Sequence, residues 1–202
     1  MKKWFAVIGL LPFMAAPAAG AATGDPEAGA QKAAVCGACH GVDGNSLNPE
    51  WPKLAAQQAG YIEAQLAAFK QGQRVNVVMA PNAMLLGEQD MADLAAYFSR
   101  QSLQGLEADP SLYEAGQKLY RGGDASRDLP ACIACHGPQG EGNGPARYPS
   151  LRAQHSVYTY NQLKAYASGE RKPVTNSIMQ AVANKLSDEE MRAVASYLQG
   201  LR

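Results

Sequence analysis

One pattern, Cys-x-x-Cys-His, constrains this chain of 202 residues more than any other feature, because it occurs twice and contains all four cysteines. The two copies span residues 36–40 and 132–136. Further landmarks recur around them in one order: Glu27-Ala28-Gly29 and Glu114-Ala115-Gly116, Trp51-Pro52 and Tyr148-Pro149, Tyr61 and Tyr158, Gly72-x-Arg74 and Gly169-x-Arg171. Each copy covers roughly 80–90 residues, which is far longer than a solenoid repeat. The sequence therefore predicts two copies of one domain.

The N-terminal segment indicates export. Lys2 and Lys3 precede an apolar run over residues 4–14, and small residues follow, including those at 19–21. This pattern is typical of a secretory signal peptide, and the apolar run is too short for a comfortable membrane span, although an uncleaved anchor stays open as the alternative. We expect residues 1–22 to be a signal peptide and the mature protein to lie in the periplasm.

The remaining chain divides where helical periodicity stops, between Gln101 and Pro110. Gly105 lies within this stretch, and glycine and proline commonly mark linkers. We therefore place an N-terminal domain at residues 23–104 and a C-terminal domain at residues 105–202.

Composition and periodicity indicate an all-α fold. Aromatic residues make up 7% of the chain and apolar residues 47%, which favours small helical domains over a β-sandwich. The 18 basic residues equal the 18 acidic ones, and this balance argues against nucleic acid as the partner. Ser187 and Glu190 form a predicted capping box at the start of the last helix. The expected helices cover residues 27–35, 61–70, 91–98, 112–121, 157–167 and a segment after 187.

The cysteine pairs have three common fates in an exported chain: a disulfide, a metal site or covalent haem. A thioredoxin-like redox pair needs a βαβ setting, and a zinc site would combine two pairs that here lie in separate repeats. Covalent haem accounts for the whole motif, because the thiols bond to the haem vinyl groups and the adjacent histidine binds iron. Two short disulfides remain the alternative. We expect two covalently bound haem c groups, attached through Cys36, Cys39, Cys132 and Cys135, with His40 and His136 as axial ligands.

Methionine is the expected sixth ligand, because a thioether stabilises ferrous iron. Met79 and Met179 lie at matching distances before the last helix of their repeats. Met84 is a rival in the first repeat, but it has no counterpart in the second. Met91 and Met191 fall on apolar helix faces and are expected in the core.

With these motifs the chain resembles a known family, cytochrome c4, whose members are di-haem electron carriers of the periplasm. The resemblance implies two tandem class I cytochrome c-like domains, each wrapped round a covalently bound haem. In such domains a proline carbonyl about a dozen residues after the haem histidine holds the imidazole ring, and Pro52 and Pro149 match that position. One departure is visible, since residues 76–78 before Met79 lack an expected proline. The family's opening and closing helices cross through a glycine and an aromatic residue, which match Gly29 with Tyr97 and Gly116 with Tyr197.

Three other polar residues allow weaker interpretations. Arg74 and Arg171 recur at matched places, where each is either a contact for a haem propionate or a solvated charge at a helix end. His155 is the one histidine outside the motifs, and we expect it at the surface or in a capping role.

Closed coordination of both irons predicts an electron carrier rather than an enzyme, because neither iron is open to substrate. The alternatives are a di-haem enzyme of the peroxidase type and a cytochrome subunit of a dehydrogenase. The resemblance implies redox protein partners, with a cytochrome bc complex as a donor and a haem-copper terminal oxidase as an acceptor. Nucleic acid is not expected, and peripheral association with a membrane stays open.

Overall fold

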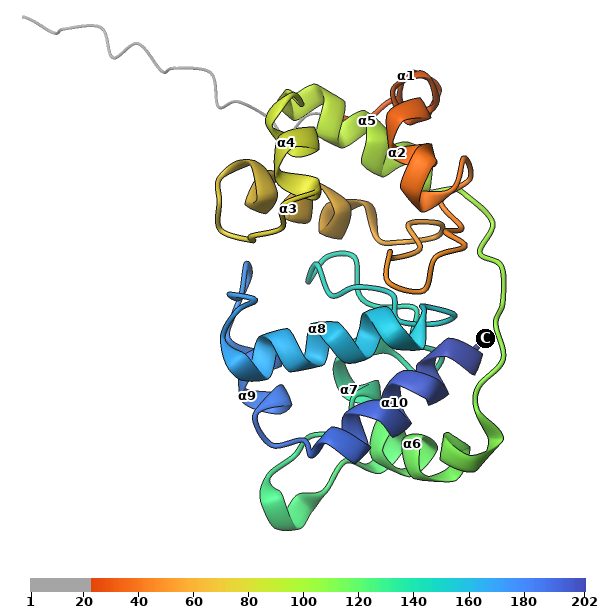
Figure 1. Cartoon of the computed structure of the whole chain (residues 1–202), viewed down its shortest axis with the longest axis vertical. Coiled ribbons are helices and arrows are strands. Elements are labelled where there is room, and N and C mark those ends of the chain that lie inside the picture. The colour runs from red at the N-terminus through yellow and green to blue at the C-terminus, as the bar shows by residue number, and fades with distance from the viewer. Residues whose placement is uncertain (1–22) are drawn as a thin grey trace, which may run out of the picture.

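The computed structural model describes residues 23–202, and the predicted signal peptide at residues 1–22 lies outside the described residues. Two helical halves stack along the longest axis of the molecule, and a segment without helix joins them along one side (Figure 1). The joining segment lies between α5 and α6 and covers residues 100–109. It coincides with the stretch in which the sequence lost its helical periodicity.

The N-terminal half contains five helices among its described residues. They are α1 (Pro26–Lys32), α2 (Ala34–His40), α3 (Ala59–Lys70), α4 (Met79–Met84) and α5 (Glu88–Ser99). The single opening helix predicted at 27–35 is wrong in one respect, because the chain turns at Ala33 and divides it into α1 and α2. The second piece, α2, carries the first Cys-x-x-Cys-His motif.

The C-terminal half repeats this order. It contains α6 (Pro110–Gly122), a 3-10 turn η1 (Ala125–Arg127), α7 (Ile133–His136), α8 (Ser156–Ser168), α9 (Ile178–Ala183) and α10 (Asp188–Gly200). Within residues 23–202 there is no β-strand, only two isolated bridges. The all-α prediction is therefore confirmed.

Helix ends follow the capping chemistry of the sequence. The Asp25 side chain accepts hydrogen bonds from the first turn of α1, which begins with a proline. The predicted capping box of α10 is present, with the Ser187 amide donating to Glu190 at 2.8 Å and the Glu190 amide donating to the Ser187 hydroxyl at 3.2 Å. Within residues 23–202 no helix is long and apolar enough to cross a bilayer.

The opening and closing helices of each half cross in close contact, as the resemblance implied. A Cβ on Gly29 of α1 would lie 2.1 Å from the Asp93 carbonyl oxygen and close to Tyr97. A Cβ on Gly116 of α6 would lie 2.2 Å from the Ala193 carbonyl oxygen and close to Tyr197. Only glycine allows the two backbones to approach this closely.

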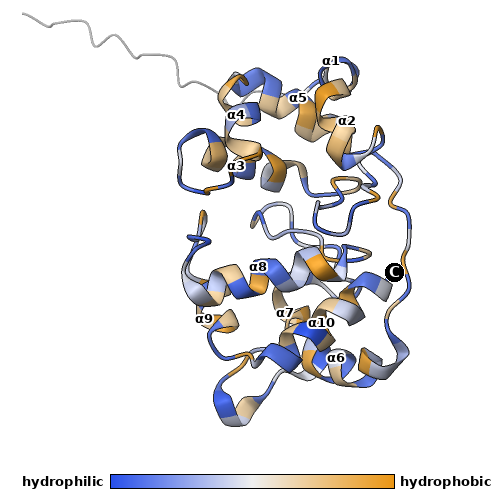
Figure 2. Ribbon diagram, viewed as in Figure 1, coloured by the Kyte–Doolittle hydropathy of each residue, from blue (hydrophilic) through white to orange (hydrophobic). Residues whose placement is uncertain are grey.

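Each half has its own apolar core beneath these crossings. Leu94, Ala95 and Phe98 of α5 pack with Ile62 of α3 in the first half. The second core is built from α6, α8 and α10 and includes Tyr120, Leu163, Met191, Val194, Tyr197 and Leu198. Met91 and Met191 are buried, which confirms their prediction as core residues. Figure 2 shows that the helices carry both apolar and hydrophilic residues, as amphipathic helices round a core do.

Candidate haem-binding cavity

One continuous cavity extends through both halves and receives side chains from each. Its lining is mostly apolar and includes leucine, valine and phenylalanine side chains from the two cores. The eight residues predicted as attachment and axial groups all line it: Cys36, Cys39, His40, Met79, Cys132, Cys135, His136 and Met179. The fold therefore brings both predicted residue sets into one apolar space.

The two motif histidines end short helices and are held alike. His40 ends α2, and its Nδ1 lies 2.8 Å from the Pro52 carbonyl oxygen. His136 ends α7, and its Nδ1 lies 3.0 Å from the Pro149 carbonyl oxygen. Because a carbonyl only accepts, Nδ1 carries the proton and Nε2 keeps its lone pair. Burial lowers the pKa of both imidazoles, so at pH 7 each is a neutral ligand for a metal.

The cysteines lie on the same short helical turns as the histidines that follow them. All four are free thiols and only partly exposed, so the structure contains neither of the alternative disulfides. Burial raises the pKa of the Cys36 thiol, and it raises that of Cys132 to about 11. Within residues 23–202 no cluster of three or more His, Cys, Asp and Glu side chains could hold a metal ion.

The methionines separate into those that reach the cavity and those that do not. Met79 begins α4 and Met179 lies in the first turn of α9, and both are half-buried in the cavity wall. The rival Met84 is 66% exposed and does not line the cavity. The sequence did not predict α4 and α9, because six residues are too few to show helical periodicity.

Arg74 follows α3 and reaches across to the other half. It donates from Nη1 to Gln65 Oε1 at 2.7 Å within its own half. From Nη2 it donates across the boundary to Gln162 Oε1 at 2.8 Å and to the Tyr158 hydroxyl at 3.0 Å. Both acceptors belong to α8, so a single guanidinium joins α3 to α8.

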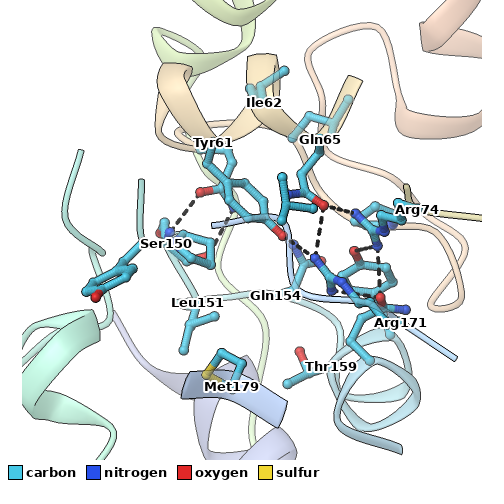
Figure 3. A pocket seen from close by; sticks show the side chains of 18 of the residues that line it. Tyr61, Ile62, Gln65, Arg74, Ser150, Leu151, Gln154, Thr159, Arg171 and Met179 are labelled. Carbon is cyan, nitrogen blue, oxygen red and sulfur yellow. Dashed lines mark hydrogen bonds between the residues drawn. The ribbon is translucent and has the colours of Figure 1, made fainter. Parts of the chain in front are cut away.

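Arg171 makes the mirror arrangement. It donates from Nη1 to Gln162 Oε1 at 2.8 Å, and from Nη2 to the Tyr61 hydroxyl at 2.7 Å and Gln65 Oε1 at 3.1 Å. Figure 3 shows Arg74 and Arg171 beside Gln65, with the bonds crossing between the halves. Each half thus contributes one arginine that donates hydrogen bonds to the other half.

This crossed pair corrects one of the two interpretations of the arginines. Arg74 and Arg171 are buried, so neither is a solvated charge at a helix end. Among residues 23–202 neither forms a salt bridge, and Arg171 Nε is buried without a hydrogen-bond partner. Burial alone would raise the pKa of the Tyr158 phenol, but the charges of Arg74 and Arg171 lower it. Two uncompensated cations in a cavity wall fit an anionic ligand such as haem, which carries propionates.

His155 is not at the surface, so that expectation is wrong. It occupies the N-cap position of α8, but its side chain makes no capping bond. Its Nε2 instead lies 2.8 Å from the Ser46 carbonyl oxygen of the other half. No sequence pattern predicts this burial, because contacts between the halves leave no local periodicity.

Comparison with known proteins supports this architecture. The model of the family described as Cytochrome c matches residues 26–102 and 113–202. Cytochrome c4 of Azotobacter vinelandii is 47% identical over 190 residues, covering 89% of this chain and 90% of the relative. The crystal structure of reduced recombinant cytochrome c4 from Pseudomonas stutzeri superposes with a TM-score of 0.87 at 45% identity, covering 89% of this chain and all of that one. A more distant relative, at 36% identity over 95% of this chain and 90% of its own length, is the thiosulfate dehydrogenase electron acceptor of Stutzerimonas stutzeri (strain A1501).

Proposed function

This chain belongs to the cytochrome c family, and within it to the cytochromes c4, and from that premise we propose that it carries single electrons through the periplasm to a respiratory acceptor such as a terminal oxidase. It is a di-haem electron-transfer protein with two covalently bound haem c groups, and it is an electron carrier rather than an enzyme. The compartment and the acceptor are the parts that we propose.

We assign the attachment and the ligands residue by residue. Cys36 and Cys39 attach the first haem and Cys132 and Cys135 the second, while the axial ligands are His40 with Met79 and His136 with Met179. One observation carries this assignment: all eight side chains line the same apolar cavity, although they come from four separate helices and, for Cys132, from the residue that precedes one of them. The domain boundary between residues 104 and 105 and the signal peptide at 1–22 belong to the same proposal.

The haem iron supplies a centre that accepts and releases one electron. The chain supplies the surroundings of that centre. The neutral, oriented imidazoles of His40 and His136 and the thioethers of Met79 and Met179 would hold the two irons and would leave no position free for a substrate. The apolar wall would keep water from the haems, and the buried cations Arg74 and Arg171 in that wall would offset the negative charge of the propionates.

That chemistry requires redox partners, and the resemblance to the cytochromes c4 suggests which ones. Redox proteins exchange electrons with the chain, and we assign a cytochrome bc complex as donor and a haem-copper oxidase as acceptor. The relative named as the electron acceptor of thiosulfate dehydrogenase supports a second candidate donor, a periplasmic dehydrogenase. Electron transfer rates with each purified partner decide between these donors.

Replacing Met179 by alanine tests the ligand assignment. Attachment uses Cys132 and Cys135, so the variant keeps both haems by mass. We expect the second iron to become partly high-spin and to bind carbon monoxide when reduced, because its sixth position is open. Met84→Ala is the matched control, since Met84 is exposed outside the cavity. A Met179→Ala protein that stays low-spin and inert to carbon monoxide contradicts the assignment.

A further inference from the structure

One peptide unit in each half joins the motif histidine to the other half of the molecule. In the first half, the Pro52 carbonyl oxygen accepts from His40 Nδ1 at 2.8 Å. The N–H of that same peptide, which belongs to Lys53, donates to Gln154 Oε1 at 2.9 Å. Gln154 comes from the C-terminal half. A continuous hydrogen-bonded path therefore runs from the imidazole through one peptide to a side chain of the other half.

The second half contains the same path in reverse. The Pro149 carbonyl oxygen accepts from His136 Nδ1 at 3.0 Å. The N–H of that peptide, which belongs to Ser150, donates to Gln57 Oε1 at 2.7 Å. Gln57 comes from the N-terminal half. The two histidines are thus supported crosswise, each by a glutamine of the opposite half.

Each glutamine is fixed by a second bond, so its orientation is determined. Gln154 Nε2 donates to the Lys53 carbonyl oxygen at 3.0 Å, and Gln57 Nε2 donates to the Ser150 carbonyl oxygen at 3.0 Å. Because a backbone N–H only donates, the amide oxygen of each glutamine must face it. All four residues are buried at 4–7% exposure, where hydrogen bonds are electrostatically stronger than in water.

The backbone before each glutamine adopts an uncommon conformation. Ala56 has φ of +53° and Ala153 has φ of +50°, in the left-handed region that non-glycine residues rarely occupy. The Ala56 amide donates to the Phe98 carbonyl at 3.0 Å, and the Ala153 amide donates to the Leu198 carbonyl at 2.9 Å. Strain of this kind persists where the surrounding structure over-determines it. The fold accepts it in both copies, and in both copies the next residue is the glutamine that crosses the boundary.

We propose that Gln57 and Gln154 are positioning residues that tune the haem of the opposite domain, Gln154 through His40 and Gln57 through His136. The physical reason is the polarisation of an amide. A hydrogen bond accepted from the peptide N–H increases the negative charge on the same peptide's carbonyl oxygen, so it accepts more strongly from the imidazole Nδ1–H. An imidazole that donates more strongly is a better electron donor at Nε2.

The consequence is an electronic link between the domains that needs no movement. A better-donating imidazole stabilises the ferric state, so each glutamine lowers the reduction potential of the other domain's haem. This inference rests on the axial-ligand assignment of the proposed function. It also makes the haem potentials depend on the association of the two halves, because an isolated half lacks the glutamine that supports its own histidine.

Leucine at each glutamine tests the crossed dependence on the full-length holoprotein. In Gln154→Leu we expect the His40 Nδ1–H resonance of the reduced protein to move upfield and the N-terminal haem potential to rise, with His136 and its haem nearly unchanged. In Gln57→Leu the affected histidine and haem are those of the C-terminal half. NMR spectra recorded through a redox titration follow the two haems separately, and the two variants control each other.

A glutamate variant separates tuning from simple loosening of the boundary. The carboxylate in Gln154→Glu still accepts from the Lys53 N–H, and more strongly, so the His40 Nδ1–H resonance should move downfield, opposite to its shift in Gln154→Leu. Two results would overturn the inference. One is an equal change in the reduction potentials of both haems in either leucine variant, and the other is a His40 Nδ1–H resonance that does not move in the Gln154 variants. These results leave the carrier function intact, whereas wild-type protein without shifted methyl resonances from Met79 and Met179 contradicts the ligand assignment instead.

Discussion

Replacing Arg171 by leucine removes one of the two arginines that form hydrogen bonds between the domains. The side chain is buried, and it donates to Tyr61, Gln65 and Gln162. Gln65 and Gln162 keep their bonds from Arg74 in the variant, whereas the Tyr61 hydroxyl loses its partner. The variant therefore lacks one cation and leaves one half-buried hydroxyl, that of Tyr61, without this hydrogen-bond donor.

The magnitude follows from these contacts. A hydrogen bond to a charged group contributes about 1.5–3 kcal/mol. The guanidinium also lies 4.5 Å from the centre of the Tyr166 ring, and such contacts add about 0.5–1 kcal/mol or more when desolvated. We expect a loss of about 2–4 kcal/mol in the free energy of unfolding. We also expect both haem potentials to fall, because one cation beside the propionates is gone.

Urea denaturation followed by circular dichroism and by haem absorbance measures the stability. Arg192→Leu is the matched control, since Arg192 lies 4.3 Å from the Tyr160 ring centre and pairs with Asp188 at 2.9 Å but is 56% exposed. Exposed pairs of this kind contribute about 0–1 kcal/mol. If Arg171→Leu loses no more stability than Arg192→Leu, the crossed arginines do not hold the domains together.

Three further predictions concern attachment, pH and docking. Replacing Cys36 and Cys39 by serine should leave one covalent haem by mass spectrometry, because the other pair is intact; complete loss of haem from a folded chain would argue against independent sites. The amide of Asp25, and then Lys32, lower the pKa of Asp93 to about 2, so its stabilising contribution is present above about pH 4 and is lost as pH falls towards 2. In Asp93→Asn the free energy of unfolding should therefore depend less on pH between about 4 and 2. If this pH dependence is unchanged in the variant, Asp93 does not contribute to acid unfolding. The halves carry formal charges of −3 over residues 22–104 and +1 over 105–202, so electron-transfer rates with a charged partner should depend on ionic strength. Rates that ignore salt would leave apolar contact as the docking force.

The sequence by itself determined the features whose chemistry is local. A Cys-x-x-Cys-His motif places two thiols and an imidazole on adjacent turns of one short helix, wherever that helix lies. Capping at Ser187 and the period of the last helices are equally local, and the structure reproduces them. The repeat predicted two domains, and in the structure each copy has a complete set of helices and its own core.

Only the tertiary structure decided what happens between the copies. From the sequence, Arg74 and Arg171 could be either propionate contacts or solvated charges, and His155 is expected at the surface or in a cap. All three are buried where the halves meet. Gln57 and Gln154 carry no periodic pattern at all, yet each binds a peptide more than 90 residues away in the chain. Periodicity records which face of a helix is covered, but not which polar groups a second domain brings to it. Those partners are selected by the geometry with which two folded copies face each other, and that geometry exists only once both have folded.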